Sequence, residues 1–232
     1  SGDDLYGFQI EMNISAANLN LKVNNVEVLK DISFTISEGK FSCLTGPSGA
    51  GKSAILKVVF GDIDYYTGFI TKVHWKEMSY VPQNIPPPAF LDVYEVVSLG
   101  LYNRKLTGGE SKELIEELLV RCGLLEIRHR KFTDISAGEK QRVWLAFALA
   151  QSKDLMLMDE PLANLDNAGK MAFFQLLRDV VDGGKTLLLV THDIELAVKY
   201  SDHIITIVDG EKIYDGSPSN FRPSQALSEN KV

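Results

Sequence analysis

The sequence predicts an α/β fold whose core is a mostly parallel sheet. Short, nearly continuous apolar runs alternate with segments of helical spacing, as at 155–158, 167–181 and 186–190. Such strands are typical of parallel sheets that are covered by helices on both faces. A glycine-rich loop at 46–51 also lies between an apolar run and a helical segment, which is the expected form of a strand–loop–helix unit.

Length and composition set the outer bounds. The 232 residues, 45% of them hydrophobic, are enough for one domain with a buried core. The net charge of −7 argues against an extended surface for DNA or RNA, so we expect no nucleic acid partner. Because no apolar run reaches the roughly 18 residues of a membrane-spanning helix, a membrane role is expected only through a partner. Cys43 and Cys122 lack metal-ligand spacing and are expected to be reduced, buried thiols of a cytosolic protein.

The first part of the chain predicts an N-terminal antiparallel β-subdomain and then a strand followed by a helix. Apolar residues alternate at 8–12, 19–23 and 32–36, as expected of strands with one buried face. The apolar run 41–45 predicts a buried strand that ends at Gly46, and 53–60 has helical spacing.

The middle of the chain, 84–152, predicts an inserted α-helical subdomain. Three consecutive prolines at 86–88 interrupt regular structure near its start. Helical spacing then follows at 92–102, 110–122 and 137–151.

Strands and helices alternate again after this insertion, at 155–158, 167–181, 186–190, 194–200 and 204–208. We therefore expect a single domain over 1–232, with its core at 5–83 and 153–218. The chain becomes rich in Ser, Pro and Asn from Gly216, so a mobile tail is expected, assigned to 219–232.

The loop at 46–53 predicts a phosphate-binding site. It fits the pattern G-x-x-x-x-G-K-[ST], with the residues Gly46, Pro47, Ser48, Gly49, Ala50, Gly51, Lys52 and Ser53. Glycines let backbone N–H groups turn toward phosphate oxygens, and the helix N-terminus favours an anion. Lys52 would add charge at the β and γ phosphates, and the Ser53 hydroxyl would ligate Mg²⁺. An ordinary glycine turn before a helix is the competing interpretation, which the agreement of strand, loop, Lys-Ser and helix disfavours.

Two carboxylates close the apolar run at 155–158. Asp159 would lie beside the phosphate loop and hold Mg²⁺, since the ends of parallel strands meet at one edge of the sheet. Glu160 follows directly, and we assign it as the general base or water-orienting group. A solvated strand end is the alternative.

Two further side chains follow apolar runs. His192 comes after the strand predicted at 186–190 and could hydrogen-bond the γ-phosphate. Gln83 follows 79–82, and its amide could reach both Mg²⁺ and the attacking water. Either residue taken alone would be weak support, because a lone His or Gln is more often structural.

With these residues in the order given, the chain resembles the ATP-binding subunits of ABC transporters over about 5–218. The run Ile135-Ser136-Ala137-Gly138-Glu139 is similar to that family's signature sequence, which other ATPases with this phosphate loop lack. The resemblance implies that Ser136 and Gly138 contact ATP held by a second subunit. It also implies that Asp166, after Leu165, lies in the loop that contacts the partner across the dimer, that Gln83 couples to the partner, and that His192 is the switch histidine. A simple helix cap at Ser136, with Glu139 three residues on, is compatible with this role.

Two positions depart from the family pattern. The signature has Ala137 where the family usually has a first glycine. Val23 stands where the family places an aromatic residue that stacks on adenine. Stacking on the base is therefore not expected from that position.

The resemblance implies a transport ATPase with ATP and Mg²⁺ as cofactors. Its expected partners are a second ATPase subunit, identical or paired, and an integral membrane permease; its expected location is the inner face of the cell membrane. The segment 91–100 is similar to subunits that serve importers of metal ions and metal chelates. A cytosolic ATPase outside transport, such as the iron–sulfur assembly type, and a nucleotide-binding module without turnover remain as alternatives.

Overall fold

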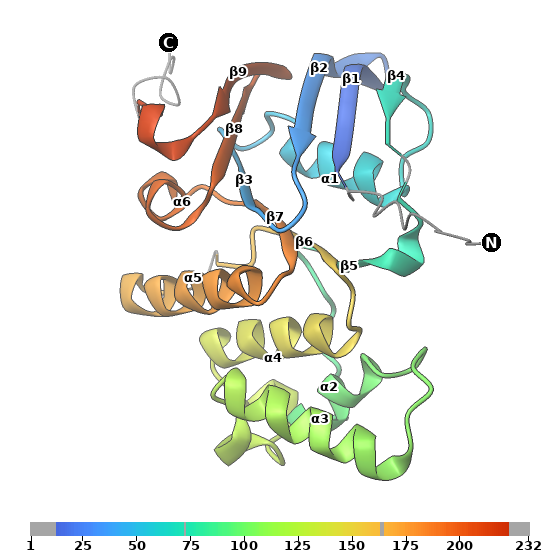
Figure 1. The fold of residues 1–232 in the computed structure, drawn as a ribbon, viewed down its shortest axis with the longest axis vertical. Coiled ribbons are helices and arrows are strands. Elements are labelled where there is room, and N and C mark those ends of the chain that lie inside the picture. Colours follow the sequence, from blue (N-terminus) through green and yellow to red (C-terminus); the bar gives the residue numbers. More distant parts are fainter. Residues whose placement is uncertain (1–12, 72, 163–164, 223–232) are drawn as a thin grey trace, which may run out of the picture.

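The computed structural model describes residues 13–71, 73–162 and 165–222 (Figure 1). Its main sheet has the order β5-β6-β7-β3-β8-β9, in which β9 runs antiparallel to β8 and the other neighbours are parallel. The strands are β3 (Phe41–Thr45), β5 (Met78–Val81), β6 (Leu155–Asp159), β7 (Thr186–Val190), β8 (His203–Val208) and β9 (Glu211–Gly216). The predicted class, α/β with a mostly parallel sheet, is confirmed.

A second, antiparallel sheet lies beside the first, with the order β2-β1-β4. Its strands are β1 (Ile14–Val23), β2 (Val26–Ile36) and β4 (Thr67–Ile70). The predicted antiparallel part is therefore present, but β1 is longer than expected and β4 was not expected at all. The strand predicted at 8–12 lies outside the described residues.

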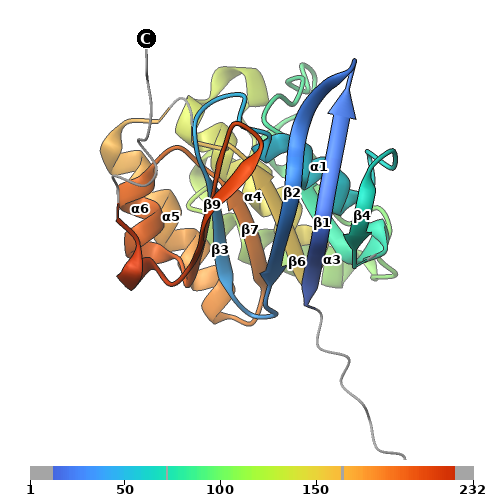
Figure 2. The ribbon, with the colours of Figure 1, turned by 90° about the horizontal axis from the view of Figure 1, so that it is seen from above.

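Helices cover both faces of the main sheet. Helix α1 (Lys52–Phe60) lies between the main sheet and the smaller one, and alternate residues of β3, β6, β7 and β8 pack with it in one apolar cluster (Figure 2). Helices α5 (Asn167–Asp182) and α6 (Ile194–Tyr200) pack on the opposite face. The strands are thus buried on both sides, which explains their nearly continuous apolar sequence.

The helical part, which lies at the bottom of Figure 1, contains α2 (Val93–Leu99), α3 (Gly108–Arg121) and α4 (Ala137–Ala150). Each of the three begins with a capping box, at Asp92, Thr107 and Ser136, so the local sequence defines where it starts. Its apolar side chains join those under α5 in one continuous core. Short 3₁₀ turns occur at η1 (Trp75–Glu77), η2 (Leu125–Ile127), η3 (Phe132–Asp134) and η4 (Pro218–Asn220). The division into a core and an inserted subdomain stays a prediction.

Two smaller expectations can be compared with the structure. Cys43 and Cys122 are both buried and unbridged, and burial raises the pKa of each thiol to about 12. Past Gly216, Phe221 is buried against the ring of Tyr214. Most of the mobile tail expected at 219–232 lies outside the described residues, so that expectation stays a prediction. None of the described helices is both long and apolar enough to cross a membrane.

Candidate active site

The phosphate loop joins β3 to α1 in a conformation that only glycine adopts easily. Gly46 and Gly51 have φ of 135° and 104°, in the left-handed region. A Cβ at Gly46 would collide with the carbonyl of Ile207, and one at Gly51 would meet Val28 and Leu29. The N–H of Gly210, in the β8–β9 turn, donates to the Ala50 carbonyl at 3.2 Å. The loop is therefore held tightly between β2 and the β8–β9 turn.

Lys52 is the first residue of α1 and is only 4% exposed. Its ammonium donates to the carbonyls of Gly46, at 2.9 Å, and Pro47, at 2.7 Å. Burial lowers its pKa, while Glu160 and Asp159 act in the opposite direction. No side chain caps the N-terminus of α1. Its first N–H groups and this lysine together form a site for an anion.

Ser53 and Asp159 lie next to each other on α1 and at the end of β6. The Ser53 hydroxyl donates to Oδ1 of Asp159 at 3.1 Å, and Asp159 is 3% exposed. Burial is the main cause of a raised pKa for this carboxyl. A hydroxyl and a carboxylate are oxygen ligands of the kind that Mg²⁺ takes beside nucleotide phosphates. The donor set therefore fits the predicted magnesium role of these two residues.

The carboxylate of Glu160 is the centre of a cluster of polar side chains. Its Oε2 accepts from the amide of Gln83 at 2.8 Å, and its Oε1 lies 2.5 Å from Nε2 of His192. The ammonium of Lys52 is 3.8 Å from the same Oε1. Because β5, β6 and β7 are neighbours, the residues that follow them meet at one edge of the sheet. The structure therefore brings together every residue predicted for catalysis.

The backbone of Glu160 also has an unusual conformation. Its φ is +47°, in the left-handed region that non-glycine residues seldom adopt. Its N–H donates to the carbonyl of Val190 at 3.1 Å. Strain of this kind persists where the surroundings fix the conformation, and it is frequent at functional sites. No local sequence pattern predicts this conformation.

The signature residues lie elsewhere. Ser136 caps α4, where its Oγ accepts from the N–H of Glu139 at 3.3 Å and its own N–H donates to that side chain at 2.7 Å. Gly138 follows in the first turn, with Leu165 beside it. The cavity at the phosphate loop, of about 260 Å³, is lined by Ser48, Gly49, Gly51, Lys52, Ser53, Ala54, Gln83 and Glu160. The structure does not bring Ser136 or Gly138 to the phosphate loop of the same chain.

Asp166 caps α5, and its Oδ1 accepts from the N–H of Gly169 at 2.8 Å. Ala137 is exposed in the first turn of α4. Val23 ends β1 and is half-buried against the apolar cluster of the smaller sheet. None of the residues that line the phosphate-loop cavity is aromatic, so that cavity supplies no ring for a base.

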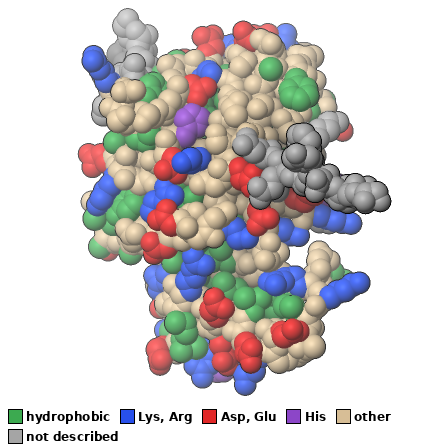
Figure 3. All heavy atoms as spheres, viewed as in Figure 1, with side chains coloured by type: hydrophobic (Ala, Val, Ile, Leu, Met, Phe, Trp, Pro, Cys, Tyr) green, Lys and Arg blue, Asp and Glu red, His purple; other side chains and the backbone are tan. Residues whose placement is uncertain are grey.

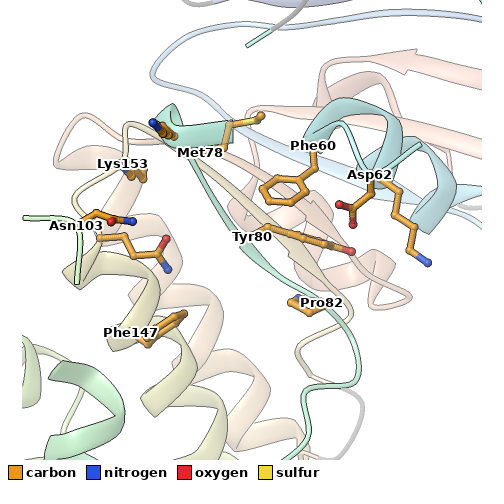
Figure 4. A pocket seen from close by; sticks show the side chains of 11 residues that line it. Phe60, Asp62, Met78, Tyr80, Pro82, Asn103, Phe147 and Lys153 are labelled. Carbon is orange, nitrogen blue, oxygen red and sulfur yellow. The ribbon is translucent and has the colours of Figure 1, made fainter. Parts of the chain in front are cut away.

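A larger cavity, of about 750 Å³, opens between the end of α1, β5 and the end of α4 (Figure 4). Tyr80 and Phe60 pack there with ring centroids 5.0 Å apart. The Tyr80 hydroxyl is buried, and burial raises its pKa to about 12. The lining residues are Lys57, Phe60, Asp62, Lys76, Met78, Tyr80, Pro82, Asn103, Phe147, Gln151 and Lys153.

Sequence reasoning missed this groove because its lining comes from several separate segments of the chain. Three of the lining side chains, Lys57, Lys76 and Lys153, are basic, against the single acid Asp62. In Figure 3, basic side chains lie along the junction between the sheet-containing part and the helical part. The sequence offers one related signal: the apolar run of β5, which forms one wall of the groove, is followed closely by the predicted site residue Gln83.

Comparisons with known proteins identify the family of this chain. Residues 29–163 match the family "ABC transporter". The iron(3+)-hydroxamate import ATP-binding protein FhuC of Bacillus subtilis is 33% identical over 220 residues, covering 88% of this chain and 82% of that protein. The manganese transport system ATP-binding protein MntB of the same organism is 34% identical over 205 residues, covering 82% and 81%.

A solved structure, cbiO1 from Clostridium perfringens, described as part of the ABC transporter complex cbiONQ, superimposes with a TM-score of 0.80. It is 26% identical in sequence and covers 89% of this chain and 88% of its own. The family match at 29–163 includes the phosphate loop and helices α2, α3 and α4. This chain therefore belongs to the ABC transporter family, as an ATP-binding subunit that hydrolyses ATP.

Proposed function

We propose that this chain is the ATPase subunit of an import system for a metal ion or a metal chelate. The observation that supports this most is the likeness to import ATP-binding proteins for iron(3+)-hydroxamate and hemin and to a manganese transport protein. These likenesses cover most of the chain, including the helical part. They favour a transport role over a cytosolic ATPase of the iron–sulfur type. Glu160 and His192, in contact with each other, argue against a module without turnover.

Each residue of the cluster has a distinct task in this proposal. Lys52 and the N–H groups of the loop bind the phosphates of ATP. Ser53, Asp159 and the oxygen of Gln83 would hold Mg²⁺, which would supply neutralisation of phosphate charge at this place. Glu160 accepts a proton from the attacking water and His192 hydrogen-bonds the γ-phosphate. Removing one such group typically lowers turnover by about 10²–10⁴-fold.

The proposed working unit contains two ATPase subunits. Ser136 and Gly138 lie away from the phosphate loop of their own chain, at the exposed N-terminus of α4. A helix N-terminus with a hydroxyl can bind a phosphate presented by a second chain. Asp166 would lie near the same interface. ATP would then hold the two subunits together, and its hydrolysis would release them.

The proposed membrane partner is a permease, and the groove next to β5 is our candidate for the surface that receives it. The groove has an aromatic floor, and its wall β5 leads to Gln83, which contacts Glu160. A partner segment bound there could move Gln83 and so affect hydrolysis. The subunit would then lie on the cytoplasmic face of the cell membrane.

The test is capture of the tagged chain from detergent-solubilised native membranes, followed by identification of the integral membrane protein that accompanies it. A variant with an arginine in the groove, Gln151→Arg, should lose that protein. A variant with an arginine at an exposed position on α3, Val120→Arg, should retain it. The transport proposal would be wrong if no polytopic membrane protein were captured with the unaltered chain.

A further inference from the structure

The side chain of Glu160 uses the groups that a terminal phosphate would need. Its two carboxylate oxygens lie 2.8 Å from the amide of Gln83, 2.5 Å from Nε2 of His192 and 3.8 Å from the ammonium of Lys52. Glu160 therefore bridges three elements, the loop after β5, the loop after β7 and the start of α1. Among the described residues, no other carboxylate contacts all three of these side chains.

Burial and backbone conformation in the loop after β6 hold the Glu160 carboxylate in this bridging position. The Glu160 side chain is 15% exposed, so its contacts lie largely out of water. Its backbone is held in the left-handed region by surrounding contacts, including the bond to Val190. A backbone conformation of this type is unfavourable and persists only when the surroundings determine it. The carboxylate is therefore directed to this place by the fold.

A carboxylate and a phosphate oxygen are both anionic acceptors and compete for the same donors. The donors on Lys52, His192 and Gln83 cannot be fully used by Glu160 and by a γ-phosphate at the same time. An incoming triphosphate must therefore displace Glu160 from its bridge. A diphosphate, which lacks the γ-phosphate, competes only for Lys52 and leaves the contacts of Glu160 with Gln83 and His192 intact.

We infer that Glu160 acts as an internal stand-in for the γ-phosphate, and that this competition sets how strongly the isolated chain distinguishes ATP from ADP. The inference rests on the proposed nucleotide role of Lys52, Gln83 and His192. It adds a binding role to the catalytic role of Glu160. While the bridge is formed, the ratio of ATP affinity to ADP affinity is smaller than it would be without the bridge. Binding of a partner, or closure of the dimer, would move Gln83 away from Glu160 and restore the larger ratio.

General repulsion between a negative charge and the nucleotide is the rival explanation. Asp159 gives a matched control, because it is the adjacent residue and its carboxylate contacts Ser53 at the same site. It does not share the Gln83 and His192 contacts of Glu160. Removing either charge relieves repulsion, but only a change at Glu160 opens the bridge.

The experiment measures the dissociation constants of ATP and ADP in EDTA, at protein concentrations that keep the chain monomeric. The proteins are the unaltered chain, Glu160→Gln, Glu160→Asp and Asp159→Asn, each checked for folding by circular dichroism. EDTA removes Mg²⁺, so any magnesium role of Asp159 does not enter. Glu160→Asp keeps the charge but shortens the side chain by one methylene, so that it cannot span the same donors.

We expect Glu160→Gln and Glu160→Asp each to strengthen ATP binding by about fivefold, the value of one ordinary net hydrogen bond. ADP binding should change by less than about twofold, and Asp159→Asn should leave the ATP-to-ADP ratio near that of the unaltered chain. An equal rise in the ratio for Asp159→Asn, or no rise for Glu160→Asp, would show that charge alone acts and would overturn the inference. Absence of ATP binding in all four proteins would instead reject the nucleotide role itself.

Discussion

The phosphate-loop side and the signature side of the site differ in how their polar groups are satisfied. Around the phosphate loop, Lys52, Gln83 and His192 each contact Glu160, so that four segments of the chain meet at one carboxylate. At the signature, the hydroxyl and the N–H of Ser136 bond with Glu139, and its carbonyl accepts from the N–H of Lys140, all within the first turns of the same helix. One side is a network within the chain, and the other is an exposed helix start. The difference supports the proposal that the second side acts on a ligand held by another subunit.

The largest expected effect comes from breaking the network at its centre. Glu160→Gln should lower steady-state ATP hydrolysis by about 10³-fold, because a general base is lost. ATP binding should persist, and an ATP-bound dimer should accumulate in light-scattering measurements. Glu195→Gln, on the exposed side of α6, is the control and should hydrolyse ATP normally. Unchanged turnover in Glu160→Gln would remove its assigned role.

Changing the signature side should be almost as damaging to hydrolysis and should spare binding. Ser136→Arg should lower turnover by about 10²-fold, because a bulky side chain blocks the approach of the second subunit. Binding of ATP to the monomer should stay the same. The matched control is Thr107→Arg, which removes an equivalent capping box from α3. A fully active Ser136→Arg protein would count against the composite site.

Glycines on the two sides should respond differently to alanine. Gly46→Ala places a Cβ against the Ile207 carbonyl at φ 135°. The free energy of unfolding, measured in urea, should therefore fall by roughly 2–3 kcal/mol. A Cβ at Gly138 would meet only the flexible ends of two side chains, Leu165 at 3.3 Å and Arg142 at 3.8 Å, so Gly138→Ala should lower the free energy of unfolding by less than about 1 kcal/mol. An equal decrease in the free energy of unfolding at both positions would contradict the claim that only Gly46 needs a backbone conformation specific to glycine.

The smallest effect concerns the buried carboxyl of Asp159, whose pKa is raised, mainly by burial. A raised pKa means that the folded state holds the proton more tightly, so stability falls as pH rises through the range above the unfolded value. Asp159→Asn should therefore be more stable than the unaltered chain at neutral pH. Each kcal/mol gained in the free energy of unfolding should raise Tm by about 2–4 °C. The gain should disappear in acid, where the carboxyl is protonated in both states. A Tm difference independent of pH would contradict this assignment.

Local sequence predicted the elements that have strong patterns. The strands at Phe41–Thr45 and Thr186–Val190 and the helix at Ile194–Tyr200 have the predicted bounds. Strand β4 was missed because three of its four residues are exposed and one is a glycine. Strand β9 was missed because none of its positions is buried, and charged residues occupy both exposed and half-buried positions. Both lie at an edge of their sheet, where burial leaves a weak signal.

The candidate site divides in the same way. Residues at strand ends could be picked from the sequence, since each follows an apolar run. The bridge from Glu160 to Gln83 could not, because these residues are 77 positions apart and meet only when β5 pairs with β6. The left-handed backbone of Glu160 has no sequence signature either. Pairing order between strands is a property of the whole sheet, so local pattern does not contain it.

The central claim is that two subunits share each site, and mixing two inactive variants tests it directly. Lys52→Ala removes the phosphate-loop side, and Ser136→Arg removes the signature side. A mixed dimer contains one site with both sides intact. If variants pair at random and sites act independently, an equimolar mixture should recover about a quarter of normal ATP hydrolysis. A mixture no more active than the two variants measured separately would contradict the account.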